Sequence, residues 1–224
     1  MSQDASHPIL DKHIAFHGVS LRASGLTSMR GDKTLFENVS LHIETPELIW
    51  VVGPNGIGKT TLLRICAGLL RPDAGTMSWQ MGDAADGTSA SAAQCVSFQP
   101  PQGFAKRGLT LAEDFNFWSR MNGSEHVLES ALDAVGLSAH KDTLTQNLST
   151  GQKRRLGLAR LLADQKPIWI LDEPMAGLDT SGRAQVAQII AAHIARGGVA
   201  MIASHNPVEI KNTPARRLTL GAVT

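Results

Sequence analysis

A glycine-rich segment, Gly53-Pro-Asn-Gly-Ile-Gly-Lys-Thr-Thr61, limits the folds open to this chain more than any other feature. It follows the apolar run Leu48–Val52 and precedes the helix-compatible stretch Leu62–Gly68. The spacing G-x-x-x-x-G-K-[ST] between a strand and a helix is that of a phosphate-binding loop. A chance match is expected in roughly one chain in a hundred of this length, and the flanking strand and helix make it rarer. The sequence therefore predicts an α/β fold built around a nucleotide-binding loop.

The residue types in this loop fit a polyphosphate with Mg²⁺. Backbone N–H groups of the loop and the positive end of the following helix can hold phosphate oxygens. Lys59 can reach the β- and γ-phosphates, and the Thr60 hydroxyl can ligate Mg²⁺. We therefore expect ATP or GTP to contact the whole loop, which comprises Gly53, Pro54, Asn55, Gly56, Ile57, Gly58, Lys59, Thr60 and Thr61.

Length and charge exclude several classes of protein. The chain has 224 residues, enough for one substantial core, and its 21 Lys and Arg against 20 Asp and Glu give a formal charge of +1. That balance provides no whole-chain attraction to nucleic acid or to an anionic membrane. The sequence shows neither an apolar run of membrane-span length nor an apolar signal core at its start. We expect a cytosolic protein in which Cys66 and Cys95 are buried apolar residues.

Hydrophobic periodicity divides the chain into a lead-in and one domain. We expect residues 1–18 to be flexible, because they are polar and show no sustained period. Residues 19–224 form the predicted domain, with a polar loop at 82–91 and a helical insertion at about 100–147. Alternating strands and helices predict a largely parallel, covered sheet. The expected strands are 19–26, 35–43, 48–52, 77–81, 94–99, 168–171 and 199–203, and the expected helices are 59–69, 111–121, 125–135, 152–163 and 181–195.

Two carboxylates end the apolar strand pattern Ile168-Trp-Ile-Leu-Asp-Glu-Pro174. Asp172 at such a strand end can hold Mg²⁺, directly or through water, and Glu173 can orient and deprotonate an attacking water. The alternative is a solvated acidic pair that caps a turn before Pro174. The phosphate-binding loop upstream favours the catalytic interpretation.

A further motif, Leu148-Ser-Thr-Gly-Gln152, precedes a basic and then apolar helix pattern. Ser149 and the Gly151 amide can lie at a helix N-terminus suited to phosphate, although an ordinary helix cap has the same residues. Together with the phosphate loop and the two-carboxylate strand, this motif resembles the L-S-G-G-Q signature of ATP-binding-cassette ATPases, with Thr150 in the third place.

The resemblance extends over most of residues 19–210, with the motifs in the expected order. Gln99 matches the family's Q-loop glutamine, Ala176-Gly-Leu-Asp179 resembles its D-loop, and His205 matches its switch histidine. Gln99 and His205 would each be unremarkable polar residues if they occurred alone. The resemblance implies a P-loop NTPase of the ATP-binding-cassette type, with a mostly parallel sheet, an antiparallel β part and a helical insertion lobe.

The family's mechanism requires two copies packed head to tail. It implies that ATP on one subunit's loop is covered by the partner's signature motif, so that Ser149, Gly151 and Gln152 act in trans and Asp179 lies close to the nucleotide. Hydrolysis of ATP to ADP and phosphate would use Glu173 as general base and His205 as a contact to the γ-phosphate. Gln99 would couple Mg²⁺ and nucleotide state to the helical lobe.

One departure from the family concerns the adenine. Many members place an aromatic residue, often tyrosine, about two dozen positions before the phosphate loop, but this chain contains no tyrosine. The matching stretch is Met29-Arg-Gly-Asp32, where the Arg30 guanidinium can stack on adenine. The alternative is a solvated arginine in a turn. The preference for ATP over GTP consequently comes from the family resemblance.

Several stretches, most of them outside the catalytic motifs, resemble a narrower family, the ATP-binding subunit of the bacterial cytochrome c maturation haem exporter. They are Arg30–Phe36, Leu69–Gly75 with Trp79, Pro167–Pro174 and His193–Gly198. This resemblance implies an ATPase that drives haem export or release of a haem-loaded chaperone. It would act at the cytoplasmic face of the inner membrane, peripherally, through integral membrane subunits. Another single-cassette importer or exporter, or a soluble cassette ATPase, is the alternative.

Two partners are not expected to contact this chain directly. Trp79 and Trp169 lie in strand patterns and are expected in the core, and the sequence has no haem-ligating motif, so we expect no direct contact with haem. The balanced charge and the lack of a basic run predict no nucleic-acid partner. The expected partner surface is the helical lobe near 99–108, with Phe104, Lys106, Arg107 and Phe115 as candidate contacts.

Overall fold

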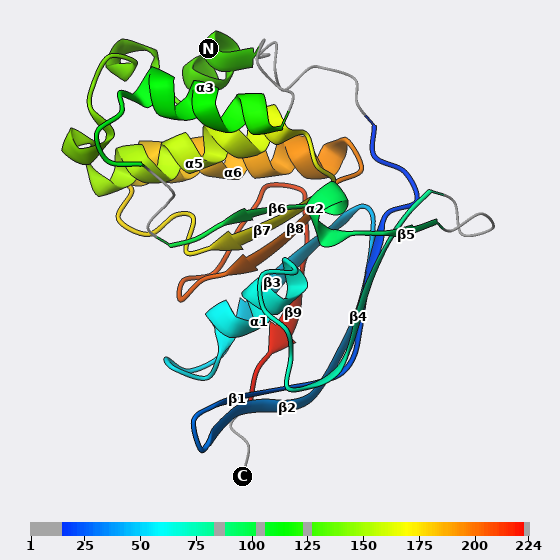
Figure 1. Ribbon diagram of the computed structural model, residues 1–224. Coiled ribbons are helices and arrows are strands. Elements are labelled where there is room, and N and C mark those ends of the chain that lie inside the picture. The colour runs from blue at the N-terminus through cyan, green and yellow to red at the C-terminus, as the bar shows by residue number, and fades with distance from the viewer. Residues whose placement is uncertain (1–14, 83–87, 102–105, 123–126, 222–224) are drawn as a thin grey trace.

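The structure, a computed structural model, describes residues 15–82, 88–101, 106–122 and 127–221 (Figure 1). A five-stranded parallel sheet has the order β6 (Val96–Gln99), β7 (Ile168–Asp172), β8 (Val199–Ala203), β3 (Glu47–Val52) and β9 (Ala215–Thr219). Every residue of β7 and β8 is buried. These strands are continuous apolar runs because helices cover both faces of the sheet.

Alternate residues of the parallel sheet enter two separate cores. Leu48, Trp169 and Ile202 pack with α5 (Thr150–Asp164) and α6 (Thr180–Ala195) on one face. Ile49 and Ile170 pack with α1 (Lys59–Cys66) on the other face. Figure 1 shows α5 and α6 above the sheet and α1 below it. The sheet edge at the carboxyl ends of its strands is therefore fixed by packing on both sides.

An antiparallel sheet forms the other wall of the α1 core. Its order is β2 (Lys33–Glu44), β1 (Ser20–Arg30), β4 (Ala74–Met81) and β5 (Thr88–Ala90). The predicted mixed fold is thus confirmed. The predicted loop at 82–91 is wrong in part, because Thr88–Ala90 pairs with β4; residues 83–87 lie outside the described residues. The predicted strand at 94–99 is also wrong in part, since α2 (Ala92–Cys95) precedes β6.

The segment predicted as a helical insertion lies against α5. It contains α3 (Leu111–Met121), α4 (Leu128–Ala134) and the short helices η2 (Ser138–His140) and η3 (Thr145–Asn147). Its described residues, 100–101, 106–122 and 127–147, hold no strand. A buried ion pair between Asp114 and Arg160 joins α3 to α5. The division into a lobe at 100–147 and a surrounding domain stays a prediction.

Several single-residue predictions can be checked directly. Cys66, Cys95 and Trp169 are buried, as expected. Phe115 is fully buried in the core between α3 and α5, so its prediction as a partner contact is wrong. Lys106 remains exposed, with its ammonium 4.8 Å from the centre of the Phe117 ring. Phe104 lies outside the described residues.

The described end of the predicted lead-in is attached to the domain. The Phe16 amide donates to the Arg196 carbonyl at 2.8 Å, and the Phe16 ring lies 5.4 Å from the His193 ring. Residues 1–14 lie outside the described residues. In the part of the chain that is described, no helix is both long and apolar enough to cross a membrane.

His193 makes the stability of the fold sensitive to pH. Its ring is fully buried, stacks on Trp169 at 3.8 Å, and places Nε2 3.0 Å from the Pro167 carbonyl oxygen. Burial, and then the charge of Arg196, lowers the pKa of His193 to about 3. An unfolded histidine has a pKa of about 6.5. Between these two pKa values the unfolded chain binds a proton that the folded chain does not, so stability is lost as pH falls.

We therefore expect His193 to reduce the free energy of unfolding by about 1 kcal/mol for each pH unit lost between about pH 6 and 5. Urea unfolding at several pH values measures this slope. His42→Gln, which replaces an exposed histidine on β2, is the comparison variant. His193→Gln should lower stability throughout and flatten the slope. An unchanged slope in folded His193→Gln would contradict this role.

Candidate nucleotide-binding site

The predicted phosphate-binding loop connects β3 to α1, as expected. Gly58 has a φ of 104°, and a Cβ added there would lie 2.9 Å from Cδ1 of Phe36. Glycine is thus required at this position by both backbone conformation and space. The Lys59 ammonium donates to the carbonyls of Gly53 at 2.8 Å and Pro54 at 3.1 Å. It is therefore held against the loop that would carry a polyphosphate.

A hydroxyl and a carboxylate adjoin this loop. The Thr60 hydroxyl donates to Oδ2 of Asp172 at 2.6 Å. Asp172 ends β7 and is only 3% exposed. Burial raises the pKa of Asp172, while the Thr60 hydrogen bond and the charges of Arg64 and Lys59 act in the opposite direction. A desolvated carboxylate beside a hydroxyl is a pair of hard oxygen donors, which fits Mg²⁺.

Glu173 lies in a strained turn directly after β7. Its φ is 51°, a left-handed conformation that costs a non-glycine residue on the order of 1–3 kcal/mol. The turn is fixed because the Glu173 amide donates to the Ala203 carbonyl at 2.9 Å. Oε1 of Glu173 accepts from the His205 amide at 3.1 Å and lies 3.4 Å from Nε2 of the His205 ring. These contacts hold the Glu173 carboxylate beside His205, and both residues line the same cleft as the phosphate loop.

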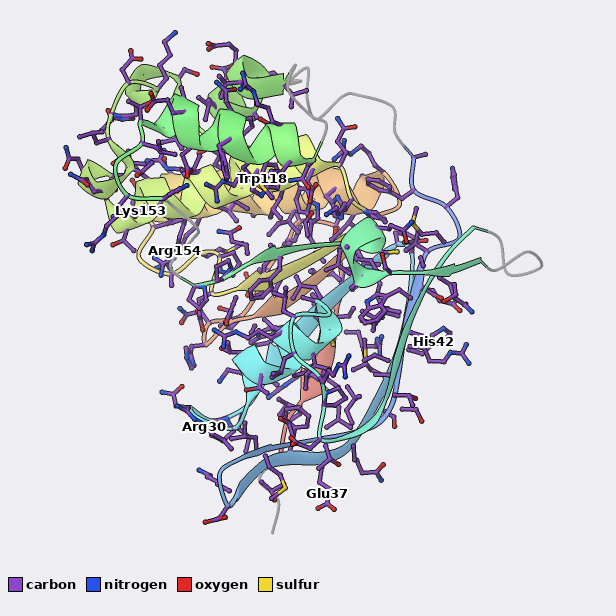
Figure 2. The ribbon with its side chains drawn as sticks, viewed as in Figure 1. Arg30, Glu37, His42, Trp118, Lys153 and Arg154 are labelled. Atoms are coloured by element: carbon purple, nitrogen blue, oxygen red, sulfur yellow. The ribbon has the colours of Figure 1, made fainter. Side chains whose placement is uncertain are left out.

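These groups share one cleft of about 300 Å³. Arg30 enters it from the end of β1, where Figure 2 labels the side chain. Leu35 and Pro101, which no sequence pattern indicated, form part of its wall. The predicted residues that line the cleft are Arg30, Asn55, Gly56, Gly58, Lys59, Thr60, Thr61, Asp172, Glu173 and His205.

Gln99 takes a different position. It is 2% exposed, its Nε2 donates to the Arg154 carbonyl at 3.1 Å, and its side chain packs on Gly157 of α5. Gln99 is not among the residues that line the cleft. Gln99 ends β6 and pairs there with Leu171, the residue before Asp172. Its role as a metal ligand stays a prediction.

The signature residues form a helix cap outside the cleft. The Ser149 hydroxyl accepts from the Gln152 amide at 3.1 Å, and Oε1 of Gln152 accepts from the Ser149 amide at 2.8 Å. Gly151 lies against Leu178. Asp179 caps α6 by accepting from the Gly182 amide at 2.8 Å. None of these residues lines the cleft formed by the chain's own phosphate loop.

Comparison with known proteins places this cleft in a family. Residues 36–176 match the family described as ABC transporter. A solved ATP-binding subunit of an ABC transporter is 24% identical with a TM-score of 0.71, covering 83% of this chain and 79% of the other. An ATP-binding cassette, described as dimeric and post-hydrolysis with bound ADP and Pi, is 22% identical with a TM-score of 0.71, covering 83% and 88%. These similarities establish the fold.

Several relatives share the name cytochrome c biogenesis ATP-binding export protein CcmA. The protein of Rhizobium johnstonii is 38% identical over 204 residues, covering 89% of this chain and 94% of the relative. That of Brucella abortus is 38% identical, covering 84% and 86%. That of Rhodopseudomonas palustris is 36% identical, covering 90% and 98%. The chain belongs to the ABC transporter family of ATP-binding subunits, in the group of the cytochrome c biogenesis ATP-binding export proteins.

Proposed function

We propose that this chain is the ATP-hydrolysing subunit of a membrane complex in cytochrome c maturation, where it drives haem export or release of a haem-loaded chaperone. The observation that supports ATP hydrolysis is the single cleft that holds the phosphate loop, the Thr60–Asp172 pair and the Glu173–His205 pair. The name shared by the relatives supports a role in export and cytochrome c biogenesis. The haem assignment comes from the resemblance in segments that lie mostly outside the catalytic motifs.

Each group in the cleft has a defined task in this proposal. Backbone N–H groups of the phosphate-binding loop, Pro54 excepted, and the Lys59 ammonium hold the β- and γ-phosphates. Thr60 and Asp172 hold Mg²⁺, which when bound supplies positive charge to the phosphates. Glu173 accepts a proton from the attacking water, and His205 contacts the γ-phosphate while it also orients Glu173. Arg30 stacks on the adenine.

A second copy of the chain completes this site. The helix N-terminus that carries Ser149, Gly151 and Gln152 lies outside the chain's own cleft, and so does Asp179. Such an N-terminus attracts phosphate oxygens through its free amides and its dipole. A head-to-tail pair lets each copy supply this second phosphate contact to the other's nucleotide. The dimeric description of one structural relative, with ADP and Pi bound, agrees with this arrangement.

The proposed location is the cytoplasmic face of the inner membrane, through integral membrane subunits. A tagged chain should co-purify from detergent-solubilised membranes with such subunits, and it should restore haem-stained c-type cytochromes to cells lacking their own export ATPase. Lys59→Ala should be recovered with the same subunits but restore no cytochrome, because it loses phosphate binding and keeps its surface. Recovery with ribosomes or DNA, without an integral membrane protein, would overturn the transport assignment.

A further inference from the structure

Arg154 on α5 makes hydrogen bonds that join three segments of the chain. Its Nε donates to the Pro101 carbonyl at 3.1 Å, and its Nη1 donates to the Ala176 carbonyl. Its own carbonyl accepts from Nε2 of Gln99 at 3.1 Å. Figure 2 shows Arg154 on the side of α5 that faces the sheet and its loops. One residue thus joins the signature helix to the segments after β6 and β7.

A glycine, Gly177, leaves room for the Arg154 guanidinium. Gly177 has a φ of 70°, and a Cβ added there would lie 3.0 Å from Nη1 of Arg154. Any larger residue at position 177 would therefore be strained and would crowd the guanidinium. The planar guanidinium presents several N–H donors in a fixed fork, so it can hold two carbonyls at a set separation.

One of these carbonyls belongs to a residue that lines the cleft, and the other belongs to the turn that carries Glu173. Pro101 lines the cleft wall together with Glu173 and His205. Ala176 ends the turn that begins at Glu173, since the Ala176 amide donates to the Glu173 carbonyl at 3.2 Å. Arg154 therefore spans from the cleft wall to the turn that carries the carboxylate. Within the part of the chain that the structure describes, its side-chain hydrogen bonds go to these two carbonyls and not to the phosphate loop or to Glu173.

We infer that Arg154 is a positioning residue for ATP hydrolysis. It holds the Glu173 turn and the Pro101 wall at a fixed place relative to the N-terminus of α5, where the Ser149–Gln152 cap lies. A change in the position of α5, as when a second copy's nucleotide reaches that cap, then moves the turn that carries Glu173. This inference rests on the proposed ATPase function and names a residue through which it acts.

Kinetic measurements distinguish a residue that positions the catalytic groups from one that only stabilises the fold. Misplacing a catalytic group by about 1 Å can cost about 10²-fold in rate. In the full-length chain with Mg-ATP, we expect Arg154→Met to lower kcat by roughly 10- to 100-fold while the Kd for ATP and the Tm stay close to wild type. Arg154→Lys should recover little of the rate, because a single ammonium lacks the fork that reaches both carbonyls.

The neighbouring Lys153 supplies a matched control. It lies beside Arg154 on α5, and its ammonium donates a long hydrogen bond, 3.5 Å, to the Gln146 carbonyl oxygen. Like Arg154→Met, Lys153→Met replaces a long, positively charged side chain with an uncharged one. It should keep the wild-type kcat. Hydrogen exchange adds a local measurement. Peptides covering residues 96–101 and 174–179 should exchange faster in Arg154→Met, whereas peptides from the rest of α5 should not.

The outcomes separate this inference from the function on which it rests. A wild-type chain that does not hydrolyse Mg-ATP at any protein concentration would overturn the proposed function. A wild-type chain that hydrolyses ATP, with Arg154→Met equal to Lys153→Met, would overturn the positioning role alone. Full rescue by Arg154→Lys, or a loss of kcat matched by losses of Tm and ATP affinity, would also overturn it.

Discussion

Glu173→Gln should bind ATP normally and hydrolyse it about 10²- to 10⁴-fold more slowly, the usual contribution of a positioned general base. The amide has the shape of the carboxylate, and its oxygen can still accept the hydrogen bond that the His205 amide donates at 3.1 Å. The backbone of the strained turn is unchanged by the substitution. What is lost is the ability of the side chain to accept a proton from water.

Single-turnover hydrolysis and equilibrium ATP binding, measured on the same preparation, test this expectation. Glu37→Gln is a suitable control because Glu37 is an exposed carboxylate on β2, away from the cleft (Figure 2). It should leave both quantities unchanged. Hydrolysis by Glu173→Gln at close to the wild-type rate would remove Glu173 from the role of general base.

The central strands were predictable because their burial is complete. A strand covered on both faces, such as β7 or β8, is an uninterrupted apolar run that the sequence displays directly. The edge strand β9 was missed because it reads Ala-Arg-Arg-Leu-Thr and is half exposed. It pairs with β3 on one side alone. Half-buried edge strands carry too little hydrophobic pattern to be recognised in a single sequence.

The site residues also fall into two groups. Some belong to local motifs that the sequence displays, and others are placed by contacts between distant parts of the chain. The phosphate loop and the Asp172–Glu173 pair are continuous motifs whose spacing implies their geometry. The wall residues Leu35 and Pro101 reach the cleft from distant parts of the chain, so no local pattern marks them. The position of Gln99 depends on a hydrogen bond to Arg154, 55 residues away. Contacts at that sequence separation are set by tertiary packing and could not be predicted from motifs.

The second prediction with a large expected effect concerns the head-to-tail pair. Two variants that are each inactive should complement each other when they pair. Lys59→Ala removes the ammonium held against the phosphate loop. Gly151→Asp places a negative side chain in the first turn of α5, where a second copy's phosphates would lie, and crowds Leu178, whose Cδ2 lies 3.1 Å from the position of a Cβ. Each variant alone has a defect in both of its composite sites. A mixed pair has one site with both defects and one site with none.

Mixing the two purified variants in equal amounts should therefore restore about a quarter of wild-type turnover, since half of randomly formed pairs are mixed and each has one intact site. Each variant alone should show almost none. The wild-type rate per chain should rise with protein concentration as pairs form.

Steady-state ATP hydrolysis of this mixture, compared with each variant alone, tests the composite site most directly. The predicted result is near-zero turnover for each variant and recovery on mixing. Wild-type turnover by Gly151→Asp alone, or a mixture no more active than the sum of its parts, would show that one chain completes its own active site.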